Sequence, residues 1–333
     1  MISLPTLVSE RRLLICVGSG GVGKTTTAAA MGLSAARKGR RVVVLTIDPS
    51  HRLKDLLHIG REGNDPQMVP LPSDYRGVLH ALVLDTKGTF DRLIYRFSPS
   101  AEVAEGILKN RLYQTISSTL AGSQEYMAAE KLYELVSGRG FDLVIVDTPP
   151  SYYTLDFLDA PHRLADLLTS RALTVLRDPS HILVHPGSRL AAATLATILK
   201  GLQRFTGLKL LQDMADFLSG FEGLVTGFRE RAEAVSRFLH QGQTAFVLVT
   251  SPEPLAMEET VHFARQIQDQ GFPLVGAVVN RLLPRSFTEP AAPASLPRGY
   301  QGLEEKLHSI HQDFQMVALR QHESLRRLSL IHI

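Results

Sequence analysis

The stretch Gly18–Thr25, GSGGVGKT, fits the pattern G-x-x-x-x-G-K-[ST] of a phosphate-binding loop, or P-loop. Because glycine lacks a Cβ atom, such a loop can turn several backbone N–H groups inward around phosphate oxygens. We expect Lys24 to place its positive charge on the β- and γ-phosphates and Thr25 to offer its hydroxyl to Mg²⁺. The motif therefore predicts a nucleoside triphosphate site near the amino end of the chain.

The segments on either side of the loop predict a strand and a helix, which is the setting that the motif requires. Leu13–Val17 is a short apolar run, and Lys24–Lys38 is rich in alanine and closes at Gly39. Further apolar runs lie at Val42–Ile47, Val78–Leu84, Phe141–Val146, Ala245–Thr250 and Leu274–Asn280. Such runs suit strands that are covered on both faces, and helical stretches separate them. The predicted fold class is α/β, a P-loop NTPase with a doubly wound, mostly parallel sheet.

Two regions lack predicted strands and are expected to be helical. Thr86–Gly138 is the first, and Thr154–Gln241 is a longer block that several prolines interrupt. We predict a single domain over residues 10–328, with a P-loop core at 12–153 and 243–328 and a helical insertion, or subdomain, at about 154–241. The apolar residues of that insertion fit a plain core better than a groove for a client, and both interpretations stay open.

The carboxyl-terminal part of the chain contains two segments of a different kind. Residues 284–299 hold four prolines among alanines and serines, which predicts a flexible surface loop. The last residues, 328–333 (LSLIHI), follow a helical stretch and do not resemble the end of a domain. We expect this tail to be non-native or truncated.

Composition excludes several classes of protein. The chain has 333 residues, of which 44% are apolar and 21% charged, which excludes a disordered or collagenous chain. The net charge of +3 gives no reason to expect a nucleic-acid partner. No apolar run reaches the ~18–20 residues that a membrane span needs, so we expect a cytoplasmic protein without direct membrane insertion. A single cysteine, Cys16, excludes an internal disulfide and a metal site built from several thiolates.

Two aspartates follow predicted strands and are candidates for the chemistry of phosphoryl transfer. Asp147 ends the run FDLVIVD, where a carboxylate would hold Mg²⁺ directly or through water. Asp48 ends VVVLTID, where a carboxylate could orient or deprotonate the attacking water. The alternative for Asp147 is a helix cap, and the alternative for Asp48 is a turn residue before Pro49.

An asparagine at the end of another predicted strand is a candidate for base recognition. Asn280 ends LVGAVVN, and its amide offers a donor and an acceptor that suit the edge of adenine. Asparagine is also favoured in turns, so this assignment stays open. The residues that we expect to bind ATP are Gly18, Ser19, Gly20, Gly21, Val22, Gly23, Lys24, Thr25, Thr26 and Asn280. Lys24 and Asp48 are the expected catalytic residues, and Thr25 and Asp147 the expected Mg²⁺ ligands.

Together these segments resemble the ArsA-type ATPases, which comprise anion-pump ATPases and ATPases that target tail-anchored membrane proteins. The family belongs to the deviant Walker-A branch of P-loop NTPases. The segments that carry the likeness are GSGGVGKTTTAAA, LTIDPSHRLKDLL, FDLVIVDTPPSYYTLDFL, AGSQEYMAAEKLYEL and VVNRLLP. In their order they cover nearly the whole chain, from about Leu13 to Leu328.

The resemblance implies a mechanism and a set of partners. It implies that Asp48 activates water, Thr25 binds Mg²⁺, Asp147 is the switch II carboxylate and Asn280 contacts adenine. It also implies a homodimer with nucleotides sandwiched at the interface, which ATP binding closes and hydrolysis reopens. The partner would be a transported cargo or a membrane-protein client.

The sequence departs from the family pattern in three places. Ser19 stands where the family has a lysine that reaches the partner's nucleotide, so we expect slow hydrolysis unless Arg52, Lys54 or another cation replaces it. Cys16 lies alone in a predicted strand, so neither a thiolate arsenite site nor a shared CxxC zinc is expected. The family's usual last strand and helix do not follow the helical stretch Gln301–Arg327.

Two other functions fit the loop. One is a phosphotransferase or ligase that acts on a small molecule, although no cluster of acceptor-binding residues is evident near the expected γ-phosphate. The other is a slow scaffold that binds nucleotide to control assembly, which the serine at position 19 keeps open.

Overall fold

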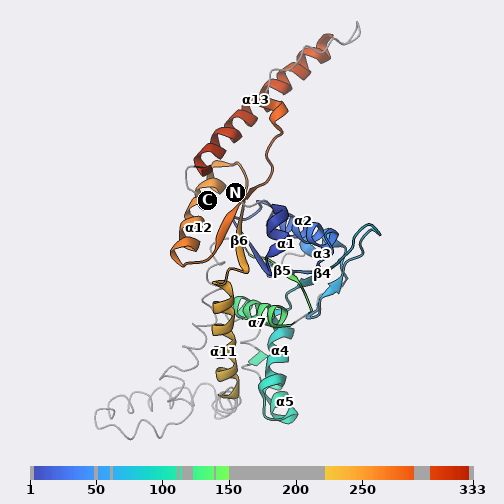
Figure 1. Cartoon of the computed structure of the whole chain (residues 1–333), viewed down its shortest axis with the longest axis vertical. Coiled ribbons are helices and arrows are strands. Elements are labelled where there is room, and N and C mark those ends of the chain that lie inside the picture. The colour runs from blue at the N-terminus through green and yellow to red at the C-terminus, as the bar shows by residue number, and fades with distance from the viewer. Residues whose placement is uncertain are drawn as a thin grey trace, which may run out of the picture.

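A parallel sheet forms the centre of the protein, whose computed structural model describes residues 4–48, 52–60, 63–110, 113–114, 123–138, 140–149, 222–288 and 301–329 (Figure 1). Within these residues seven strands lie in the order β3-β4-β2-β5-β1-β6-β7. Their bounds are β1 Leu13–Val17, β2 Arg41–Thr46, β3 Gln67–Met68, β4 Val78–Val83, β5 Leu143–Asp147, β6 Thr244–Thr250 and β7 Leu274–Val279. All the pairs are parallel except β3 with β4. The prediction of a doubly wound, mostly parallel α/β sheet is confirmed.

The central strands are buried on both faces, which explains why they are continuous apolar runs. Every residue of β1, β5 and β6 is buried. Strand β1 lies between β5 and β6, and β2 lies on the other side of β5. Since the carboxyl ends of parallel strands meet at one edge, the segments that follow β1, β2 and β5 lie close together.

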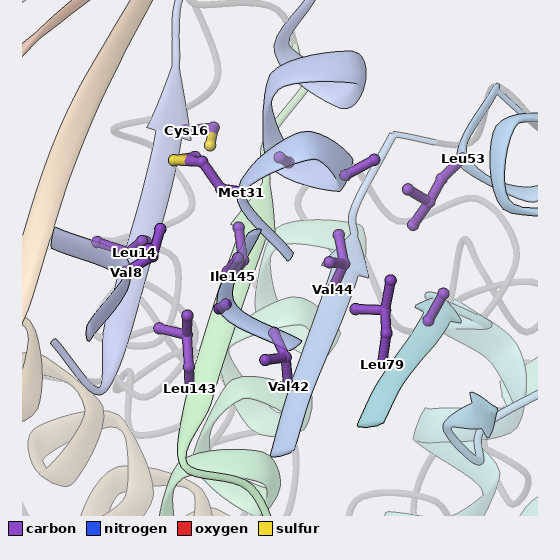
Figure 2. Close-up of a cluster of buried hydrophobic side chains, with 14 of the residues drawn as sticks. Val8, Leu14, Cys16, Met31, Val42, Val44, Leu53, Leu79, Leu143 and Ile145 are labelled. Carbon is purple, nitrogen blue, oxygen red and sulfur yellow. The ribbon is translucent and has the colours of Figure 1, made fainter. Parts of the chain in front are cut away.

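One face of the sheet is covered by helices from the first part of the chain, α1 (Leu4–Glu10), α2 (Lys24–Arg37) and α3 (Arg52–Leu57). Figure 2 shows the apolar cluster between these helices and the strands. Its labelled members are Val8, Leu14, Cys16, Met31, Val42, Val44, Leu53, Leu79, Leu143 and Ile145. Cys16 is fully buried in this cluster, and burial raises the pKa of its thiol. A buried thiol with a raised pKa is typical of an unreactive core cysteine.

The opposite face packs against α7 (Ser123–Ser137), α11 (Glu222–Leu239) and α12 (Pro254–Asp269). Helices α4 (Thr86–Phe97) and α5 (Ala101–Lys109) join α7 in a third apolar cluster. These three described helices agree with the expected helical region at 86–138. Most of the predicted helical insertion at 154–241 lies outside the described residues, and only its last part is described, as α11.

Three elements differ from the sequence-based expectation. Helix α1 was not expected, and it forms because Leu7 and Val8 are buried against the sheet face that α2 covers. Strand β3 has only two residues, too few to give an apolar pattern. A 3-10 turn, η3 (Arg285–Thr288), lies within the predicted loop at 284–299 because Phe287 packs on His311 and Phe314. Residues 289–299 of that loop are outside the described part of the chain.

A long terminal helix, α13 (Gln301–Ser329), extends away from the sheet beside α12 (Figure 1). It continues past Arg327 and includes the first two residues of the predicted tail 328–333, whose other residues are not described. No helix in the described ranges has both the length and the apolar character to cross a bilayer.

Candidate nucleotide-binding site

The loop between β1 and α2 approaches its neighbours so closely that glycine is required at two positions. A Cβ atom on Gly18 would lie 2.0 Å from the main-chain oxygen of Val249 at the end of β6. A Cβ atom on Gly23 would lie 2.2 Å from Nδ2 of Asn280, and Gly23 also has a φ of +96°. At these two positions the loop backbone itself contacts the residues at the ends of β6 and β7, with no room for a side chain. Such close backbone packing leaves the N–H groups of the loop available for phosphate.

The Lys24 side chain folds back over the first two residues of the loop. The side chain is buried, and its Nζ donates hydrogen bonds to the main-chain oxygens of Gly18 and Ser19, each at 2.8 Å. Burial lowers the pKa of this ammonium, and the carboxylates of Asp147 and Asp48 oppose that change. The charge is thus held within the loop, where the β- and γ-phosphates of a nucleotide would lie.

Asp147 connects the loop to the neighbouring strands. The carboxylate is fully buried, and its Oδ2 accepts hydrogen bonds from Thr25 Oγ1 at 2.7 Å and from Thr46 Oγ1 at 3.0 Å. The other oxygen, Oδ1, is buried without a hydrogen-bond partner among the described residues. Because buried carboxylate oxygens are normally satisfied, this oxygen fits a water or cation ligand beside the Thr25 hydroxyl.

Burial also changes the acidity of Asp147. It raises the pKa of this carboxyl to about 6, and the hydrogen bonds from Thr25 and Thr46 only partly oppose the shift. The following residue, Thr148, donates its hydroxyl hydrogen bond to the main-chain oxygen of Cys16 at 2.7 Å, which fixes the end of β5 against β1. The carboxyl group is therefore rigidly placed and weakly acidic.

This shift predicts a pH-dependent contribution to stability. The pKa of Asp147 is about 6 in the folded protein against an ordinary value of 3.8, so the folded state binds the proton more tightly. The resulting stabilisation is complete below the ordinary pKa of 3.8 and is lost as the pH rises through the folded-state pKa of about 6. Between about pH 4.5 and about pH 7.5, Asp147 should change the free energy of unfolding by about 2 kcal/mol.

Urea unfolding of wild type and Asp147→Asn at both pH values measures this contribution. It is the change in the free energy of unfolding between the two pH values for wild type, minus the same change for the variant. Asp142→Asn is the matched control, because Arg41 holds the pKa of Asp142 below its ordinary value. That control should keep the stabilisation at acid pH. An Asp147→Asn variant with the same pH dependence as wild type contradicts the prediction.

Asp48 and Asn280 lie at the same edge of the sheet. Asp48 follows β2, is half-buried, and acts electrostatically on both Lys24 and Asp147. Asn280 follows β7, and its Nδ2 donates to the main-chain oxygen of Val22 at 3.0 Å. The structure thus brings the residues predicted for the site to this edge of the sheet. One N–H of the Asn280 amide is already engaged, because it donates to the loop at Val22.

Sequence reasoning missed two residues of this arrangement. Thr46 and Thr148 supply the hydroxyls that fix Asp147 and the end of β5, and each stands at the end of an apolar run. A threonine at a strand's carboxyl end beside a P-loop was the available signal. Among the described residues, no group of three or more His, Cys, Asp or Glu side chains could hold a metal ion.

Comparison with known proteins gives matches along nearly the whole chain. The family described as anion-transporting ATPase, ArsA_ATPase, matches residues 11–323. The ATPase GET3 of Phaeosphaeria nodorum is 24% identical over 311 residues, which are 92% of this chain and 88% of the relative. The ATPase get3 of Aspergillus terreus is 26% identical over 323 residues, covering 95% and 87%. The ATPase GET3 of Podospora anserina is 25% identical over 325 residues, again covering 95% and 87%.

Proposed function

We propose a nucleotide-driven switch, starting from the fact that this chain belongs to the ArsA family of anion-transporting ATPases and is an ATP-hydrolysing enzyme. In this proposal, Mg²⁺ assists hydrolysis and each catalytic cycle moves a homodimer between closed and open forms. The observation that carries the proposal is the pairing of Thr25 with Asp147 at the foot of the P-loop. It brings the Thr25 hydroxyl beside a carboxylate whose Oδ1 has no hydrogen-bond partner in the described part of the chain, and these two groups suit a nucleotide-bound cation.

The residues of the loop bind and orient the triphosphate. The backbone N–H groups of residues 18–25 hold the phosphates, and Lys24 contributes the charge that favours them. Thr25 and Asp147 are the groups that would hold Mg²⁺, which when bound neutralises charge on the phosphate oxygens. Thr46 keeps Asp147 in place from the end of β2, the strand that Asp48 follows.

Asp48 has the role of positioning water for in-line attack on the γ-phosphorus. Its carboxylate is half-buried and acts electrostatically on Lys24 and Asp147, so it lies near the loop and remains reachable by solvent. In this position it accepts a hydrogen bond from the water and holds the proton that the water loses. Asn280 is proposed to contact adenine with the part of its amide that does not brace Val22.

The dimer and its client are proposed from the family resemblance. The chain carries one P-loop, and sandwiching of two nucleotides between two copies would give each cycle a closed and an open form. The proposed partner is a transported cargo or a client membrane protein, which the switch binds or releases as it opens.

A mass measurement tests the switch. With Mg²⁺ and ATP, light scattering of the Asp48→Asn variant should give a mass of twice 36.7 kDa, and small-angle X-ray scattering should show expansion when ADP replaces ATP. The variant is chosen because it should bind ATP without consuming it. Lys24→Ala is the control that should not respond to nucleotide. A mass of 36.7 kDa under saturating ATP would contradict the proposed dimer.

A further inference from the structure

The phosphate-binding loop contains one cationic side chain, and its second residue is a short serine. Ser19 is buried, its main-chain oxygen accepts from Lys24, and its Oγ has no hydrogen-bond partner among the described residues. A serine carries no charge with which to stabilise a transferring phosphoryl group. A second cation for this role, in addition to Lys24, must therefore come from outside the loop.

One arginine outside the loop lies close enough to affect the loop lysine. Arg52 lowers the pKa of Lys24 by like-charge repulsion, whereas the carboxylates of Asp147 and Asp48 raise it. No hydrogen bond or ion pair joins the Arg52 side chain to a described residue, and the side chain is exposed. Its guanidinium is thus a solvated charge beside the site.

The fold holds this arginine at the site through its helix. Arg52 is the first residue of α3 and stands four positions after Asp48. The next residue, Leu53, is fully buried in the cluster between the sheet and α2 (Figure 2). Leu57 is buried one turn later. Because α3 is fixed on α2, the helix that begins at Lys24, Arg52 has a defined position relative to the loop.

Helix stability does not explain a cation at this position. A positive charge in the first turn of a helix opposes the helix dipole, so α3 gains nothing from it. The neighbouring Lys54 differs, because it is not among the charges that shift the pKa of Lys24. The two cations of α3 therefore lie in different electrostatic surroundings, and only Arg52 shares those of the loop.

We propose that Arg52 is a catalytic arginine that acts in cis, donating hydrogen bonds to γ-phosphate oxygens in the transition state of ATP hydrolysis. This assignment rests on the proposed function. In the reaction, the water oxygen bonds to the γ-phosphorus and the bond from that phosphorus to the bridging oxygen breaks. ADP and inorganic phosphate are the products, and the water proton passes to Asp48. Arg52 changes none of its own bonds and stabilises the charge that spreads over the phosphoryl oxygens.

The test compares Arg52→Ala with Lys54→Ala, the matched cation on the same helix. Arg52→Ala should lower kcat by on the order of 10³, since arginines of this kind contribute ~10³–10⁵. Affinity for a non-hydrolysable ATP analogue should change by less than about threefold, while affinity for ADP with aluminium fluoride should be lost. Lys54→Ala should match wild type in all three measurements. The melting temperature of each variant shows that it is folded.

Two further variants make the assignment sharper. Ser19→Lys introduced into Arg52→Ala should recover part of the lost kcat, because it supplies a cation from within the loop. Mixing Arg52→Ala with Lys24→Ala should give no recovery, because a residue acting in cis cannot serve the other copy. Recovery in the mixture would overturn the cis assignment.

Failure of this inference is distinguishable from failure of the proposed function. Hydrolysis by Arg52→Ala at the wild-type rate would overturn the role of Arg52 alone. If the purified wild-type protein bound no Mg²⁺·ATP and released no phosphate, the proposed function itself would fail.

Discussion

Replacement of Lys24 by alanine is expected to remove ATP binding and turnover. The lysine is the charged group of the loop, and burial holds its ammonium over Gly18 and Ser19 instead of in solvent. Its hydrogen bonds to phosphate would be charge-assisted at both partners, which makes them stronger than neutral ones. We expect kcat/KM to fall by at least about 10³, with nucleotide affinity below the range of titration calorimetry.

The Lys24→Ala variant should remain folded, which makes its loss of function interpretable. Burial lowers the pKa of Lys24, so its charged form is already disfavoured in the folded state. Lys38→Ala is the matched control, because Lys38 caps the other end of α2 and binds Pro5 and Ser9 away from the loop. An unchanged affinity of Lys24→Ala for Mg²⁺·ATP would remove the basis of the assigned site.

The Asp48→Asn substitution should separate binding from hydrolysis. Asparagine keeps the size of the side chain but cannot take a proton from water, so kcat should fall by on the order of 10²–10⁴. The phosphate-binding groups, Lys24 and the loop backbone, are untouched, so calorimetry should give an ATP affinity close to that of wild type. Phosphate release in single-turnover experiments measures the chemical step directly.

The control for Asp48→Asn is Asp55→Asn, which removes a carboxylate from the exposed side of the nearby helix α3. It should leave kcat unchanged. Full turnover by Asp48→Asn would reject Asp48 as the residue that activates water. If Asp48→Asn lost ATP affinity as well as kcat, the carboxylate would contribute to nucleotide binding and not specifically to the chemical step.

The sheet was predictable because its central strands obey a simple rule. Leu13–Val17 and the run before Asp147 are continuous apolar segments, and burial on both faces requires this composition. Edge elements follow no such rule. Strand β3 has two residues, and α1 depends on the burial of Leu7 and Val8 against elements that lie later in the chain.

The site was predictable in its residue types and less so in its contacts. The P-loop pattern and the ends of apolar runs indicated Lys24, Asp48, Asp147 and Asn280. The bond from Thr46 to Asp147 and the bond from Asn280 to Val22 join segments that are distant in sequence. No periodicity encodes such contacts, because they depend on the order of strands in the sheet.

The contacts of Gly18 with Val249 and of Val22 with Asn280 have a consequence for synthesis on the ribosome. The amino acids of the motif leave the exit tunnel well before the groups that brace them, which are translated more than two hundred residues later. A nascent chain that stops before position 280 carries the complete motif without the amide that supports it. Competence to hold a nucleotide is therefore acquired only after the segment that carries Asn280 has been translated and can fold against the loop.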